Sequence, residues 1–304
     1  MKEQRFSKIA DVLVEYIREH KHENWQTGLI KGISMRTGCK YNGKRFTGLN
    51  IILTYMYIDR YGYDSNIFLT YREVQNLGGY VKAGAKGQPI LRANWGWLDK
   101  NNKYFYRKGW SRKDYLEAGC KEQFFGWQVY NEFNISQTSL EYEAIKASDI
   151  VFQNRKASEI VEGYLAAGGA EIMHESFLEC PCYIPTLDRI EIFPQDHYTS
   201  EANYYSPLFH EMVHSTGAEQ RLDRVMNTDF DSKEYREEEI IAELGSSMLM
   251  VEAGFDESEY LDNNTAYTAH WLERLEADAD AAVLEIQRCF TKAFAAKEYI
   301  LGER

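Results

Sequence analysis

The stretch FHEMVHSTG, residues 209–217, places two histidines four positions apart and a glutamate directly after the first. On a helix, residues i and i+4 lie one above the other, so His210 and His214 can both reach one metal ion. Glu211 lies about 100° round the helix, where its carboxylate can take a proton from a water molecule at the metal. The motif therefore predicts a peptidase-type metal centre on a helix over residues 201–217.

We expect a proline near the start of this helix and a glycine at its end. Pro207 precedes the motif and suits the first turn of a helix, and Gly217 suits the position that ends one. A catalytic zinc takes three protein ligands and leaves one position open, so another segment must supply a ligand. Residues 235–250, YREEEIIAELGSSMLM, belong to a predicted helix over 234–253. Its apolar stripe comprises Ile240, Ile241, Leu244, Met248 and Val251.

Two glutamates on one flank of this stripe are the candidates for the third ligand. Glu239 and Glu243 lie four residues apart and share a helix face. We expect Glu239 to ligate the metal and Glu243 to orient a ligating histidine, and the reverse assignment stays open. Glu237 and Glu238 suit a solvated helix start, where acidic side chains favour the helix dipole.

Other parts of a peptidase mechanism are less determined by the sequence. Tyr204, Tyr205 or His197 could stabilise the transition state, and His197 equally suits an ordinary surface position. Peptidases of this kind hold the substrate backbone along an exposed strand edge. The strand around residues 189–193 is the candidate edge, with an ordinary core strand as the alternative.

No feature of the sequence predicts export or membrane insertion. The first 20 residues are charged and amphipathic, unlike a signal peptide. The longest nearly apolar run, residues 49–58, is too short to span a bilayer. Five cysteines without an export signal favour reduced thiols, and we interpret Cys180 and Cys182 as structural. We therefore expect a cytoplasmic protein with no membrane partner.

The net charge of −12 conceals two halves of opposite sign. Residues 1–140 contain 22 Lys and Arg against 13 Asp and Glu, a balance of +9. Residues 141–304 contain 13 against 34, a balance of −21. This asymmetry predicts two domains with different partners, and the first of them suits polyanions.

The basic half is also rich in aromatic residues, with five of the six tryptophans. Single-stranded nucleic acid is bound by such a combination of positive groove and aromatic faces, although most of these rings are expected in the core. Trp95 and Trp97, two apart in a predicted strand, would share one face. The candidate DNA-binding residues are Lys44, Arg45, Tyr71, Arg72, Lys82, Lys86, Trp95, Trp97, Arg107 and Lys108.

Hydrophobic periodicity predicts an α+β chain of two domains, each with its own core. In the first half we expect helices over 6–20, 47–60 and 71–77, then short strands within 80–97, 103–110 and 124–136. In the second half we expect a strand or hairpin over 182–194 and helices over 156–167, 201–217, 234–253 and 263–299, the last broken near Ala279. A polar segment, residues 136–149, separates domain 1–140 from the mainly helical domain 150–304.

An ordered series of segments along the chain resembles the ArdC-like antirestriction proteins of mobile elements. It includes YNGKRFTGLNIILT, FLTYREVQNLGGYVKAGAKGQPI and YNEFNISQT in the first half. It continues with YIPTLDRIEIFP, YYSPLFHEMVHSTGAEQRLDR, YREEEIIAELGSSML and AYTAHWLERLEAD in the second. Ser215 departs from the family, in which an aromatic residue often follows the second histidine.

The resemblance implies an N-terminal single-stranded-DNA-binding domain joined to a zincin-like metallopeptidase domain. It implies protection of incoming DNA against restriction, with Zn²⁺ as the metal or another divalent ion such as Mn²⁺. By position, His210 and His214 match the family's metal ligands, Glu211 its catalytic glutamate, and Glu239 and Glu243 its acidic pair.

Two alternative functions stay open at this stage. One is a DNA-binding protein whose metal only stabilises the fold, although a structural zinc needs no general base. The other is a metalloprotease acting on a host or regulatory protein, with a basic half that selects an acidic protein instead of DNA. In every peptidase reading, the protein or peptide substrate is unknown.

Overall fold

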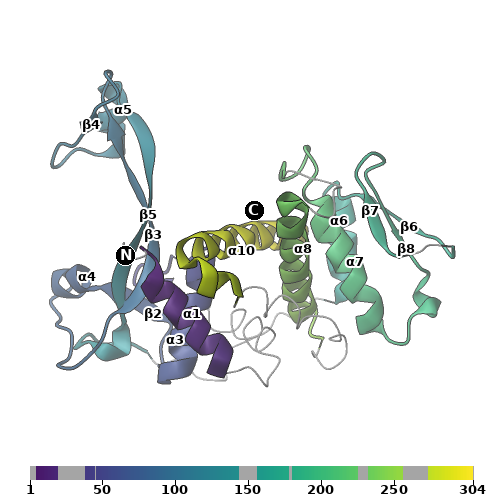
Figure 1. Ribbon diagram of the computed structural model, residues 1–304, viewed down its shortest axis with the longest axis horizontal. Helices are drawn as coiled ribbons and strands as arrows, with labels where there is room; N and C mark the ends of the chain where they lie inside the picture. Colours follow the sequence, from purple (N-terminus) through teal and green to yellow (C-terminus); the bar gives the residue numbers. More distant parts are fainter. Residues whose placement is uncertain are drawn as a thin grey trace.

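The computed structural model describes residues 5–19, 38–44, 46–143, 156–177, 180–224, 232–255 and 273–303. The chain has an α+β fold with two lobes, which a C-terminal helix joins (Figure 1). Trp25, Arg45 and residues 144–149 of the predicted linker lie outside the described residues. Within the described residues, no helix combines the length and apolar character that a bilayer-spanning segment needs.

The N-terminal lobe contains a five-stranded sheet in the order β1-β2-β5-β3-β4. Strand β1 (Cys39–Lys40) runs parallel to β2 (Ile67–Thr70), and the other neighbours are antiparallel. Helices α1 (Ser7–Glu19) and α3 (Leu49–Tyr61) bury their apolar stripes in the core of this lobe. Helix α4 (Tyr71–Asn76) begins at a capping box formed by Thr70 and Glu73, which satisfies backbone donors at its start.

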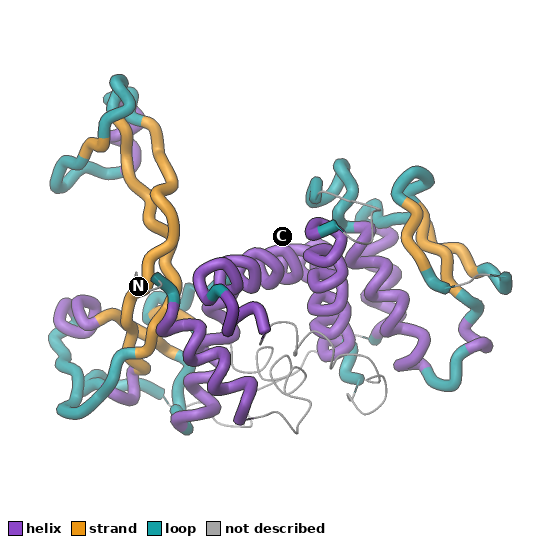
Figure 2. Tube along the Cα trace, viewed as in Figure 1, coloured by secondary structure: helices purple, strands orange, loops and turns teal. Residues whose placement is uncertain are grey.

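A long hairpin extends from this sheet away from the rest of the molecule (Figure 2). Its strands are β3 (Gln88–Leu98) and β5 (Lys121–Asn134), with β4 (Tyr104–Phe105) and α5 (Arg112–Glu117) at the far end. At the base of the hairpin, the β3 residues Ile90 and Leu91 are buried in the core. We call residues 92–127, the part beyond this base, the arm.

The C-terminal lobe combines helices with a three-stranded sheet in the order β6-β8-β7. Helix α6 (Ala157–Ala166) precedes β6 (Glu171–His174), which is parallel to β8 (Arg189–Ile192). Strand β7 (Cys182–Ile184) forms an antiparallel hairpin with β8. A short 3₁₀ turn (Gln195–His197) then leads to α7 (Glu201–Ser215), which lies against α8 (Lys233–Glu252).

The C-terminal helix α10 (Ala279–Leu301) belongs to the cores of both lobes. It contacts α6, α7 and α8 in one lobe and α1 and α3 in the other. The Gln287 side-chain oxygen accepts a hydrogen bond of 2.6 Å from the Leu49 backbone N–H at the start of α3. The Asp280 carboxylate accepts from the backbone N–H groups of Arg5 and Phe6. Most buried apolar residues of the two lobes belong to one cluster, whereas Leu69, Val74 and Ile135 form a small separate one. The main cores of the two lobes are therefore continuous, and the expectation of two separate cores is wrong.

Most predicted helices are found within two residues of their expected ends. The predicted hairpin over 182–194 is found as β7 and β8, whereas the strands of the first half differ. The three short strands predicted after residue 79 are two long strands and the two-residue β4. Helix α5 and strands β1, β2 and β6 were not predicted, because their short patterns give no clear period. Pro207 lies well inside α7 instead of in its first turn, since the helix begins at Glu201. The break before Ala279 is confirmed, with Asp278 capping α10.

Candidate metal centre

The centre forms where α7 and α8 approach each other closely. The Ser200 side chain caps α7 by accepting from the Asn203 backbone N–H. On α8, a Cβ atom at Gly245 would lie 2.8 Å from a methyl group of Val213, the residue before His214. A larger residue at 245 would therefore push the helices apart at the level of the centre.

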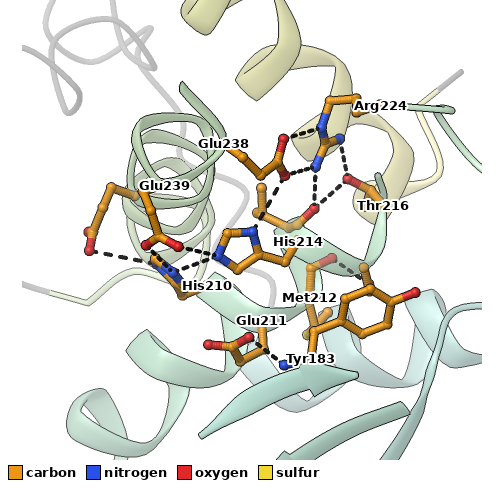
Figure 3. A network of polar contacts seen from close by, with 12 residues as sticks. Tyr183, His210, Glu211, Met212, His214, Thr216, Arg224, Glu238 and Glu239 are labelled. Atoms are coloured by element: carbon orange, nitrogen blue, oxygen red, sulfur yellow. Dashed lines mark hydrogen bonds and ion pairs between the residues drawn. The ribbon is translucent and has the colours of Figure 1, made fainter. Parts of the chain in front are cut away.

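Three side chains from these helices meet at one point (Figure 3). The Nε2 atoms of His210 and His214 lie 3.0 Å apart. The Glu239 carboxylate oxygens lie 3.5 Å from each of these nitrogens. All three residues are largely buried. Their ligand atoms all lie within 4.8 Å of one another, and no other set of three such residues in the described part of the chain meets this condition.

The spacing suits a small divalent ion. A tetrahedral zinc with bonds of about 2.0–2.1 Å keeps its ligand atoms roughly 3.3 Å apart, close to the three separations found here. Two imidazoles and one carboxylate leave one position of a tetrahedron free for water or substrate. The geometry thus fits the expectation for His210, His214 and Glu239, and it favours Glu239 over Glu243 as the third ligand.

Each histidine also contacts a glutamate through its other ring nitrogen. The His210 Nδ1 atom lies 3.6 Å from the Glu243 carboxylate, the position expected of an orienting residue. The His214 Nδ1 atom lies 3.4 Å from the Glu238 carboxylate. Such contacts fix the tautomer and direction of a ligating imidazole.

The interpretation of Glu238 as a solvated residue is wrong, because its side chain is buried. The Arg224 guanidinium donates to both Glu238 oxygens, at 2.6 and 3.0 Å. The guanidinium also donates to the Val213 carbonyl and the Thr216 hydroxyl at the end of α7. Glu238 precedes the buried Ile241 and Ala242 by three and four residues, and this helical spacing could have shown that it faces inward.

Glu211 is buried beside the histidines and faces the small sheet. One of its carboxylate oxygens accepts a hydrogen bond of 2.7 Å from the Tyr183 backbone N–H of β7. Burial raises the pKa of Glu211 above its usual value, although the histidines and this hydrogen bond oppose the shift. A carboxylate with a raised pKa is a better proton acceptor in general-base chemistry.

The carboxylates around the histidines have a large effect on their protonation. Burial alone would lower the pKa of His214, but the Glu238 and Glu239 carboxylates raise this pKa to about 10. The pKa of Glu239 is lowered by its hydrogen bonds to His210 and His214, against the effect of burial. Without a metal, the centre thus holds positive charge on His214 between two carboxylates.

The candidate transition-state stabilisers occupy different environments. The Tyr204 hydroxyl is buried and lies 2.8 Å from His174 Nε2. The Tyr205 ring contacts Phe209 and Phe255. The His197 ring stacks on Phe193 and contacts Asp196, as expected for a satisfied surface histidine.

The predicted substrate edge is wrong, because β8 is the central strand of its sheet. Residues 189–192 pair with β6 on one side and β7 on the other. The strand next to Glu211 is β7, an edge strand that contains Cys182. Cys180 and Cys182 are free thiols, as expected.

The candidate DNA-binding residues fall into two groups. Lys44, Tyr71, Arg72, Lys82 and Lys86 are exposed on the body of the N-terminal lobe. Trp95, Arg107 and Lys108 are exposed on the arm, whereas Trp97 is half-buried and stacks on Tyr115. Arg45 lies outside the described residues. The structure therefore does not gather these residues into one patch.

Two family models match the chain, one in each lobe. Residues 3–120 match the N-terminal domain of the anti-restriction factor ArdC. Residues 159–285 match a zincin-like metallopeptidase. The two matched segments cover the DNA-binding candidates and the metal centre respectively.

Among curated proteins, the chain is 28% identical over 270 residues to the DNA primase TraC of Escherichia coli. That match covers 86% of this chain but only 23% of TraC, so the chain spans less than a quarter of this relative. It is 26% identical to the uncharacterized protein y4eC of Sinorhizobium fredii, over 79% of this chain and 74% of that protein.

Two crystal structures of the antirestriction protein ArdC from plasmid R388 resemble the chain over nearly its whole length. The metal-free structure gives a TM-score of 0.63 at 24% identity and covers 98% of each chain. The Mn(II)-bound structure gives a TM-score of 0.64 at 26% identity and covers 96% of each chain.

Proposed function

We propose that the chain binds single-stranded DNA and hydrolyses a protein or peptide. It joins an ArdC N-terminal domain to a zincin-like metallopeptidase domain and so belongs to the ArdC-like antirestriction proteins. The observation that carries the peptidase part is the convergence of His210, His214 and Glu239 beside the buried Glu211. The DNA part is supported by the basic, aromatic character of the first 140 residues. The proposed role is the protection of incoming DNA from restriction, in the cytoplasm.

His210, His214 and Glu239 would hold the divalent ion. When bound, such an ion polarises a peptide carbonyl and makes water more acidic. Glu211 accepts the proton of the attacking water and passes it to the leaving amine. Glu243 and Glu238 keep the two imidazoles oriented, and Arg224 fixes Glu238 in turn.

The identity of the metal is part of the proposal. Two imidazoles and a carboxylate suit Zn²⁺ and also accept Mn²⁺. A related ArdC structure contains Mn(II). We propose Zn²⁺ as the resident ion, with Mn²⁺ as a competent substitute.

Glu211→Gln tests the peptidase assignment. The variant should lose hydrolysis of a casein substrate by about 10²–10⁴-fold, while binding metal and single-stranded DNA as the wild type does. Metal content is measured by atomic absorption and DNA binding by fluorescence anisotropy. If the variant loses the metal, Glu211 is a ligand and the assignment is wrong. If wild-type protein loaded with Zn²⁺ or Mn²⁺, with and without DNA, leaves casein and a peptide library uncut, the peptidase part of the proposal fails.

A further inference from the structure

Five large aromatic side chains are exposed on the arm, which extends away from the other elements (Figure 1). Their exposed fractions are 58% for Trp95, 66% for Tyr104, 68% for Tyr106, 36% for Phe124 and 40% for Phe125. Soluble proteins rarely leave so many rings together in water unless the surface binds something. The question is which partner this surface fits.

The strand pairing distributes these rings over both faces of the hairpin. Trp95 pairs with Phe124, so the two rings share one face, with centroids 5.2 Å apart. Tyr104 pairs with Leu98 and lies on the opposite face with Phe125, with centroids 5.6 Å apart. Each face therefore presents a pair of adjacent rings.

Gly96 makes the second ring pair possible. A Cβ atom at this position would lie 2.9 Å from the Phe125 ring and 3.0 Å from the Tyr104 ring. Both rings thus lie directly over the backbone of β3, and a side chain at residue 96 would displace them. The pair is held in place by the strand beneath it.

A separate set of aromatic residues forms the internal support of the arm. Trp97 stacks on the buried Tyr115, with centroids 4.8 Å apart and planes at 3°. Phe105 and Trp110 pack edge-on against the same tyrosine. These rings give the arm a small core of its own, so the exposed pairs stand on an ordered base.

The charge of the arm indicates a polyanionic partner. Residues 92–127 contain eight Lys and Arg and four Asp and Glu, a balance of 8 − 4 = +4. Asp99 and Asp114 accept backbone hydrogen bonds in turns. Glu117 and Glu122 pair with Lys113 and Arg112. Lys103, Lys108 and Lys121 form no ion pair within the part of the chain that the structure describes and remain exposed.

We propose that the arm is the base-stacking element for single-stranded nucleic acid, with unpaired bases stacked on the ring pairs Trp95–Phe124 and Tyr104–Phe125. Lysines beside the rings contact the phosphates. Alternating rings and cations suit an unpaired strand, because bases within a duplex have no free face. This inference rests on the proposed DNA binding. It places the bases on the arm and not on the exposed aromatic residues of the lobe body.

Anisotropy of a labelled 20-nucleotide single strand, titrated with the full chain, tests this assignment. The variants Trp95→Ala/Phe124→Ala and Tyr104→Ala/Phe125→Ala should each weaken binding by about 5- to 100-fold. The matched control Tyr41→Ala/Tyr80→Ala removes two exposed rings from the lobe body and should change binding less than twofold. The ring variants should keep the wild-type salt dependence, because they retain every charge. Lys103→Ala/Lys121→Ala should reduce the slope of log K against log salt by about 1.4.

Gly96→Ala provides a test that deletes no ring and no charge. It should weaken DNA binding by displacing Tyr104 and Phe125. Combining it with Trp95→Ala/Phe124→Ala should weaken binding further, by the product of the two separate fold-changes. Circular dichroism of each variant checks that the fold is retained.

The outcomes separate the inference from the function on which it rests. If wild-type protein does not bind the strand at low salt, the proposed DNA binding fails. If wild-type protein binds but the arm variants bind equally well, the DNA lies elsewhere and the arm assignment is overturned. If light scattering shows a dimer that the arm variants dissociate, the rings are a self-association surface and the inference is also overturned.

Discussion

The metal centre and the arm hold their functional side chains in opposite ways. At the metal centre, each ligand is largely buried and contacts a second polar group, as in the chain from His214 through Glu238 to Arg224. On the arm, the rings are exposed, and backbone geometry at Gly96 holds one pair in place. Buried polar networks give a single arrangement at a high cost when one member is lost. The exposed ring pairs have no such network, so the proposed chemistry and the proposed DNA binding rest on regions of different construction.

Removing the outer carboxylate at the metal centre should have the largest effect outside the ligands themselves. Glu238→Gln should weaken metal binding by about 10–100-fold, because His214 loses the partner that orients it and Arg224 loses its counter-charge. Competition with a chromophoric chelator measures this affinity. The matched control is Glu237→Gln on the preceding residue, whose carboxylate contacts Arg288 instead of a histidine. Equal effects in both variants would show that Glu238 acts only through the charge of the helix.

A change of pH should distinguish the two regions, because one ligand of the metal centre, His214, titrates. His214 must lose its proton to ligate a metal, and its pKa in the metal-free protein is raised to about 10. Metal affinity should therefore rise by up to about tenfold per pH unit between pH 7 and 9, with proton release on binding. Calorimetry in two buffers of different ionisation enthalpy measures that release. Buffer-independent heats would mean that His214 is already neutral.

The smallest predicted effect concerns Gln287 on α10, the helix that joins the two lobes. Gln287→Ala should destabilise the protein by about 1–3 kcal/mol, because the Leu49 backbone N–H would lose its buried acceptor. The melting temperature should fall by roughly 2–10 °C in a single transition. Glu298→Ala, an exposed position on the same helix, is the control. Two separate transitions in the variant would show that the lobes unfold independently and that the shared cluster is not cooperative.

The helices and the metal motif could be predicted from the sequence because both depend on local spacing. His210, Glu211 and His214 share a single helix, and Glu239 lies on a second helix with a clear apolar stripe. The contacts of Glu238 with His214 and Arg224 join three separate segments of the chain, so local spacing alone does not reveal the proposed orienting role. The central place of β8 was missed for the same reason, since it depends on β6, which a four-residue pattern does not predict.

The arm shows a different limit of sequence reasoning. Trp95 and Trp97 share the spacing that places both on one strand face, yet only Trp95 remains exposed. Tyr115, 18 positions further along the chain, covers Trp97. Whether a ring belongs to the core or the surface is thus decided by tertiary contacts, even within a pair of residues with the same local pattern.

The place of α10 in both lobes has a consequence for synthesis on the ribosome. Leu49 and Gln287 are 238 residues apart in sequence, yet they meet in the core of the N-terminal lobe. At ~5–20 residues per second, α10 emerges roughly 10–50 s after α3. During that interval the apolar faces of α1 and α3 lack part of their final covering. The nascent chain is therefore exposed to chaperones and proteases for most of its own translation, and the first lobe can complete its core only after the metal-binding helices have been made.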